Sequence, residues 1–206
     1  MKKLLTVCVL WLSLPSYGQD FQKDSLKKEL SEIYKSDQLS RAEMAKINPT
    51  ELRIVELVNK QDKIDSVNLI RVVKILDSIG YPVKSEYGDS AGLGTFHVIQ
   101  HSTAAYQEKY LPLFQKAAKN NELEWKWVAM MTDRVRLNKG LKQIYGTQIH
   151  PGKDPETGYL TNKAEIAPIE DEKNVNKRRA KVGLRPIEEE ARAFGIDYKP
   201  RYKDAL

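Results

Sequence analysis

The chain has 206 residues, with 34 Lys and Arg against 28 Asp and Glu, a formal net charge of +6 and one cysteine. This length suits one domain with a sizeable core. The mild charge, with no basic residues interleaved with aromatic ones, argues against nucleic acid as a partner. Because the single cysteine, Cys8, lies near the N-terminus, a chain trimmed there has no disulfide, thiolate nucleophile or Cys-ligated metal.

The N-terminus has the pattern of an export signal. Lys2 and Lys3 precede an apolar run, residues 4–14, and Ser16-Tyr17-Gly18 forms a small-x-small cleavage site. We therefore predict a signal peptide over residues 1–18 and a periplasmic or extracellular protein with a net charge of about +4. The apolar run is too short to span a bilayer, so no membrane partner is expected after cleavage, and an uncleaved anchor is the alternative.

The expected elements are mostly helices, and no repeat or linker divides the chain. In chain order they are a helix from Ser25 to Lys46, a helical region from Pro49 to Ile79 that stops at Gly80, a glycine-containing loop from Glu86 to Gly94, a helix from Thr95 to Tyr110, and a shorter one starting at Pro112.

The second half adds the only expected β structure. In chain order we expect a helix from Glu122 to Leu141, a long-looped hairpin of Gln143–His150 with Gly158–Ile169, helices over Asn174–Val182 and Pro186–Phe194, and a loosely held tail over residues 198–206. The predicted fold is mainly α: a single helical domain over residues 19–197 with a small β-hairpin near the C-terminal third.

Charged and amide side chains occupy helix positions that the 3.6-residue period assigns to the core. Asp37 and Arg41 share the stripe of Leu26, Leu30, Ile33 and Met44. Asp65 and Asn68 lie on the face of Val72, Ile75, Leu76 and Ile79. In the later helix Arg134 lies at the middle of the stripe Leu123, Trp127, Met130, Leu137 and Leu141, with Asp133 at its edge.

A buried charge needs a partner or a ligand. We therefore predict that Asp37, Arg41, Asp65, Asn68 and Arg134 form one cluster. Two interpretations stay open: a pocket lined by polar groups, or a closed ion-pair network that fixes helix packing.

His101 points away from the bulky apolar face of its helix, towards Ala104 and Ala105. It could act as a general acid or base, or be structural. His97, four residues earlier, has a spacing that can present two imidazoles to a metal, but the HExxH glutamate is absent and a third ligand is missing. We assign no metal.

The segment from Gln143 to Gln148 places two amides, a phenol and a hydroxyl around Gly146. These groups could line a polar site or belong to an ordinary strand. No nucleophile elbow, P-loop or CxxC motif is present.

The order of these motifs resembles a bacterial family of unknown function whose marker is a Q-x-YGTQ segment. The matching positions are Asp37-Gln38 with Arg41, Asp65 with Asn68, Gly80-Tyr81-Pro82, Gln100-His101, Asp133-Arg134, Gln143 with Tyr145-Gly146-Thr147-Gln148, and Val175-Asn176 with Arg178-Arg179 and Gly183-Leu184. The resemblance spans residues 31–184. It implies a fold and marker positions but no reaction, and His97 is not among the markers.

The first functional hypothesis is a hydrolase or transferase acting on a small polar or anionic substrate. Arg134, with Arg178 or Arg179, would hold the anion, His101 would transfer protons, and Asp65 or Asp133 would orient it or activate water. The remaining candidate ligand contacts are Asp37, Arg41, Asn68, Gln100, Gln143, Tyr145, Thr147 and Gln148. The alternatives are a non-catalytic exported ligand-binding or protein-interaction module and, third, a secreted effector or its neutraliser. The sequence specifies no cofactor.

Overall fold

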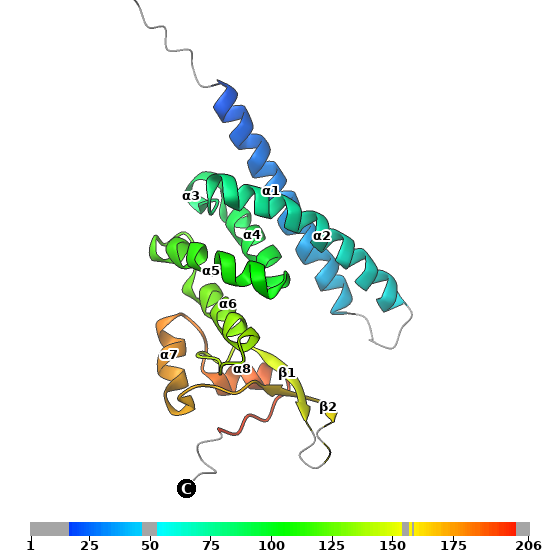
Figure 1. The fold of residues 1–206 in the computed structure, drawn as a ribbon, viewed down its shortest axis with the longest axis vertical. Helices are drawn as coiled ribbons and strands as arrows, with labels where there is room; N and C mark the ends of the chain where they lie inside the picture. Colours follow the sequence, from blue (N-terminus) through cyan, green and yellow to red (C-terminus); the bar gives the residue numbers. More distant parts are fainter. Residues whose placement is uncertain (1–16, 47–52, 154–156, 158, 201–206) are drawn as a thin grey trace, which may run out of the picture.

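The structure is a computed structural model that describes residues 17–46, 53–153, 157 and 159–200 (Figure 1). Its elements are α1 (Tyr17–Met44), α2 (Arg53–Ile79), α3 (Lys84–Tyr87), α4 (Asp89–His101), α5 (Ala104–Lys119), α6 (Trp125–Asn138), β1 (Ile149–Lys153), β2 (Leu160–Ile166), the 3-10 turn η1 (Glu172–Asn174), α7 (Val175–Lys181) and α8 (Ile187–Ala193). The predicted class is confirmed: the chain is mainly helical, with a two-stranded antiparallel hairpin in its C-terminal third.

The two longest helices, α1 and α2, run side by side in opposite directions (Figure 1). Polar pairs link the two helices: Arg53, at the start of α2, bonds Glu43 near the end of α1, and Arg71 bonds Glu29 near the middle of α1. Helix α4 packs against both, and α5 and α6 continue the helical layer. The apolar core fills the space between them, with Phe96 fully buried at its centre. Asp37 of α1 consequently lies inside the molecule.

The predicted loop over residues 86–94 is wrong, because α3 and α4 occupy most of it. Only Gly88 makes a turn, with a φ of 84°. Gly92 and Gly94 lie within α4 on the side that touches other backbone. A Cβ on Gly92 would lie 2.2 Å from the Tyr81 hydroxyl, and one on Gly94 would lie 3.1 Å from Tyr34 Cβ. These two glycines therefore allow close helix packing. From sequence alone, a glycine in this role cannot be distinguished from a glycine in a loop.

The helix expected from Thr95 to Tyr110 is interrupted after His101. Ser102 adopts extended backbone, and its hydroxyl donates to the Ile99 carbonyl. Helix α5 then runs through Pro112, which was expected to start a new helix. Pro112 is exposed, where water can reach a carbonyl that the proline leaves unpaired. The interruption places His101 at a helix end.

The β-hairpin with α7 and α8 forms the other end of the molecule, below α6 in Figure 1. It has its own small core of Ile166, Ile169, Val175, Ile187 and Ala191. The expected strand over residues 143–150 is shorter, since β1 begins at Ile149 and includes the Pro151-Gly152 pair that was expected in the loop. Residues 143–148 instead form an irregular segment, linked to Ile169 by one isolated bridge at Gln143.

Two expectations concern the ends of the chain. Residues 1–16 lie outside the described residues, so signal cleavage after Gly18 stays a prediction. Pro49, the expected start of the second helical region, also lies outside them. Tyr198, at the start of the expected loose tail, donates to Glu172 over 2.6 Å, and residues 201–206 lie outside the described residues. Among the helices of the described ranges, none is both long and apolar enough to cross a bilayer.

Candidate functional site

A fully buried carboxylate, Asp37 of α1, is the centre of the polar cluster. Its Oδ1 accepts from Arg41 Nε at 3.3 Å and lies 3.4 Å from His101 Nδ1, and its Oδ2 accepts from Gln38 Nε2 at 2.7 Å. Burial raises the pKa of Asp37, but the hydrogen bond and charge of His101, the charge of Arg41 and the Gln38 amide together bring it below its ordinary value. Asp37 is therefore held as an anion.

Arg41 extends this cluster from α1 to α2. Its Nη2 lies 2.7 Å from both carboxylate oxygens of Asp65. Gln61, one turn earlier on α2, donates to Asp65 Oδ1 at 2.6 Å. Asn68 does not join the ion pairs, because its amide donates to Ser36 of α1. The predicted Asp37, Arg41 and Asp65 contacts are thus present, and Asn68 lies beside them.

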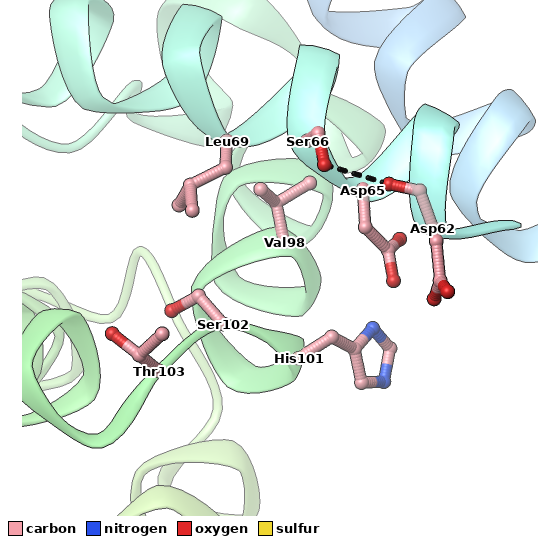
Figure 2. Close-up of a pocket in the computed structure, with 8 residues that line it drawn as sticks. All are labelled: Asp62, Asp65, Ser66, Leu69, Val98, His101, Ser102 and Thr103. Carbon is pink, nitrogen blue, oxygen red and sulfur yellow. Dashed lines mark hydrogen bonds between the residues drawn. The ribbon is translucent and has the colours of Figure 1, made fainter.

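A cavity of about 380 Å³ opens between α2 and the C-terminal end of α4 (Figure 2). Its lining residues are Asp62, Asp65, Ser66, Leu69, Val98, His101, Ser102 and Thr103. Figure 2 shows the Asp65 carboxylate extending from α2 towards the side where the His101 ring lies. The cavity therefore has a carboxylate and an imidazole from different helices on its wall.

The two ring nitrogens of His101 have different surroundings. Nδ1 faces the Asp37 carboxylate, which can only accept, so a neutral ring carries its hydrogen on Nδ1. Nε2 has no hydrogen bond with any residue of the described ranges, and it is not among the fully enclosed polar atoms. His101 is 25 % exposed. An imidazole held in this way can take up a proton at Nε2.

His97 is a partly buried neighbour of His101 rather than a second group on the cavity wall. Its ring stacks on His101 at 6.1 Å between centroids and meets Trp127 edge-on at 5.2 Å. Burial, then the charge of His101, lowers the pKa of His97 to about 4, so it is neutral at physiological pH. Within the described ranges, no three His, Cys, Asp or Glu side chains converge as a metal site.

Arg134 of α6 lies apart from the acids of the predicted cluster. Its Nε donates to Gln148 Oε1 at 3.1 Å, and its Nη1 donates to the carbonyl of Gln100 at 3.2 Å. The structure thus brings Arg134 to the C-terminal end of α4, one residue from His101. None of the carboxylates in the described ranges forms an ion pair with it.

Asp133, expected at the edge of its helix stripe, is fully buried, whereas Arg134, expected at the middle, is partly exposed. The reason is the segment that Asp133 holds: its carboxylate accepts from the backbone N–H groups of Ile144, Tyr145 and Thr147 and from the Thr147 hydroxyl. Burial raises the pKa of Asp133, against these donors, which favour the ionised form. Its oxygens face protein donors rather than the cavity.

The remaining motif residues hold the same segment from other sides. The Gln143 amide bonds Ala167 O at 2.6 Å and both backbone groups of Gln148. Arg178 donates to Ile144 O, and the fully buried Arg179 donates to Tyr145 O at 2.8 Å. Tyr145 is partly buried, and burial raises the pKa of its phenol. The Q-x-YGTQ segment is therefore a bonded scaffold, and Gln148 is the residue through which it reaches Arg134.

Sequence reasoning missed several cavity residues. Ser102 and Thr103 follow His101 directly, but the expected continuous helix hid them at a helix end. Gln61, which bonds Asp65 without lining the cavity, was missed as well, although it precedes Asp65 by four residues on α2 and helix spacing alone could have found it.

A profile of the family described as "Family of unknown function (DUF6624)" matches residues 24–203, so the chain belongs to this family. The predicted resemblance to a family of unknown function is confirmed. Searches of curated proteins and of solved structures gave no match.

The first prediction concerns the carboxylate that organises the Q-x-YGTQ segment. In Asp133→Asn an amide NH₂ faces backbone donors, so we expect the free energy of unfolding to fall by about 3 kcal/mol. Urea denaturation measures this change, and Asp24→Asn, at an exposed position of α1, should stay within about 0.5 kcal/mol of wild type. Equal midpoints for the two variants would contradict the scaffold assignment.

The second prediction concerns pH. Because folding lowers the pKa of His97 from 6.5 to about 4, the unfolded chain binds a proton in that range and the folded chain does not. Stability should therefore be complete above about pH 6.5 and decline as the pH falls towards 4, and His97→Phe should flatten this decline. Denaturation midpoints across the range measure it. An NMR titration that places the His97 midpoint near 6.5 would refute the assignment.

Proposed function

We propose that this member of the family of unknown function (DUF6624) is a hydrolase or transferase acting on a small polar or anionic substrate beside His101. The observation that carries the proposal is the Asp37–His101 pair. Nδ1 of His101 lies 3.4 Å from the fully buried carboxylate of Asp37. His101 lines the cavity, and its Nε2 has no hydrogen-bond partner among the described residues. This is the arrangement that general acid–base chemistry requires.

In the proposed reaction the neutral ring accepts a proton at Nε2 from water or from a substrate hydroxyl. The imidazolium that forms is stabilised by Asp37, which also fixes the orientation of the ring. The oxygen that lost this proton attacks the electrophilic atom of the substrate and forms a bond to it. As the bond between that atom and the leaving group breaks, the proton passes from Nε2 to the leaving group. Asp65, already bonded by Arg41 and Gln61, orients substrate donors at the cavity wall.

The proposal gives Asp133, Arg178 and Arg179 positioning roles instead of the chemical roles expected from sequence. Their charged groups bond the backbone of residues 144–147. Charged groups that are already bonded to their own backbone are poorly placed to meet a substrate.

The second candidate is a non-catalytic ligand-binding module. It is favoured by one observation: Arg41 contacts both oxygens of Asp65, the acid on the cavity wall that could otherwise activate water. Under either function we propose that the protein acts after export, in the periplasm or outside the cell, because of the signal pattern of residues 1–18.

The test uses p-nitrophenyl acetate and p-nitrophenyl phosphate as probes of acyl and phosphoryl transfer. Wild type should turn over at least one of them, and His101→Gln should lose about 100-fold or more in rate, the usual contribution of a general base. His150→Gln removes a histidine on β1, away from the cavity, and should keep the wild-type rate.

Both variants should melt within a few degrees of wild type, since His101 belongs to neither apolar core and the amide of a glutamine there can still donate to Asp37. Equal rates in wild type and His101→Gln would remove the catalytic role. Failure of wild type to exceed the buffer rate with both probes would favour the binding module.

A further inference from the structure

We propose that Arg134 binds an oxyanion, a carboxylate or phosphate group of the ligand, at the C-terminal end of α4. The Nη1 group of Arg41, which bonds no described residue, would contact the same oxyanion. This deepens the proposed function by naming the chemical class of the group recognised. It rests on that function only in making His101 act on the same molecule, because the anion subsite follows from the contacts of the two arginines.

Arg134 differs from every other arginine that is wholly or partly buried in the described ranges. Arg41 pairs with Asp37 and Asp65, and Arg136, Arg178 and Arg179 pair with Glu170, Asp171 and Glu190 respectively. Arg134 bonds only a side-chain amide and a backbone carbonyl. The carbonyl end of α4 offsets part of its charge. A guanidinium taken partly out of water without a carboxylate is unfavourable unless a ligand supplies the charge.

The Arg134 guanidinium is nevertheless held in one orientation. Gln148 accepts from its Nε, and the Gln148 amide is itself fixed by donating to Met130 O and Thr147 Oγ1. The Gln100 carbonyl accepts from its Nη1. Nη2 has no partner among the described residues and is not fully enclosed. A planar fork positioned by neutral groups, with N–H groups left over, is suited to a carboxylate or phosphate.

Arg41 offers a second set of free N–H groups. Its Nε and Nη2 bond the two aspartates, whereas Nη1 bonds no residue of the described ranges. Arg41 shares Asp37 with His101, and Arg134 bonds the carbonyl of Gln100, the residue before His101. Burial, then the charge of Arg41, lowers the pKa of Arg134, so the two guanidinium groups repel each other. An anion between them would relieve this repulsion.

The subsite adjoins the proposed general base. Arg41 and His101 share one oxygen of Asp37, and the carbonyl bonded by Arg134 belongs to the residue before His101. The Gln100 amide is also buried, and neither of its polar atoms has a hydrogen-bond partner in the described part of the chain. A ligand anchored by its oxyanion at Arg134 would therefore place its remaining atoms next to the imidazole.

The experiment is isothermal titration of the full mature chain with inorganic phosphate and, separately, with acetate, at constant ionic strength. We expect saturable one-site binding of at least one anion by wild type, and at least a tenfold weaker affinity for Arg134→Met. Arg71→Met is the matched control, because it removes one surface guanidinium from α2 that pairs with Glu29. Its affinity should equal that of wild type. The two anions show whether the site prefers a carboxylate or a phosphate group.

Absence of saturable binding of both anions by wild type, or equal affinity in Arg134→Met, would overturn the proposal. The His101→Gln variant separates this outcome from the catalytic one. It should bind the preferred anion within about twofold of wild type, because its imidazole makes no contact with Arg134. Unchanged anion binding in Arg134→Met with activity lost in His101→Gln would reject the subsite and leave the proposed function standing. Because methionine fills a similar volume, the melting temperature of Arg134→Met should stay within a few degrees of wild type.

Discussion

The arrangement of the first helices depends on the burial of one charge, the Asp37 carboxylate. An ionised group taken out of water must be matched by donors or cations, or the fold loses several kcal/mol. Asp37 pairs with Arg41 on its own helix and with His101 on α4. Arg41 in turn pairs with Asp65 on α2. The same contacts that satisfy Asp37 thus join three helices and orient the imidazole at the cavity.

A second buried carboxylate does similar work at the other end of the molecule. Asp133 accepts hydrogen bonds from three backbone N–H groups and one hydroxyl of residues 144–147. Arg178 and Arg179 donate to carbonyl groups of the same segment. This scaffold ends at Gln148, which holds Arg134 beside α4. The C-terminal third therefore contributes to the site by positioning one guanidinium, without lining the cavity itself.

Helix periodicity predicted the inward position of Asp37 and its pairing with Arg41, because side chains four residues apart on a helix must be neighbours. It failed at Gly92 and Gly94, where glycine serves close packing, and at Asp133, where a segment distant in sequence decides which face is buried. The Q-x-YGTQ residues looked like ligand contacts, since a side chain's hydrogen-bonding capacity is the same whether it bonds a ligand or its own backbone. Only tertiary structure separates those two cases.

The site depends most directly on the contact between Asp37 and the Nδ1 side of the His101 ring. The tautomer of the neutral ring reports this contact and can be read from the nitrogen chemical shifts of His101 by NMR. We expect hydrogen on Nδ1 in wild type, and loss of that preference in Asp37→Asn, whose amide no longer offers two acceptor oxygens. A wild-type ring with its hydrogen on Nε2, or a tautomer unchanged in Asp37→Asn, would contradict the account.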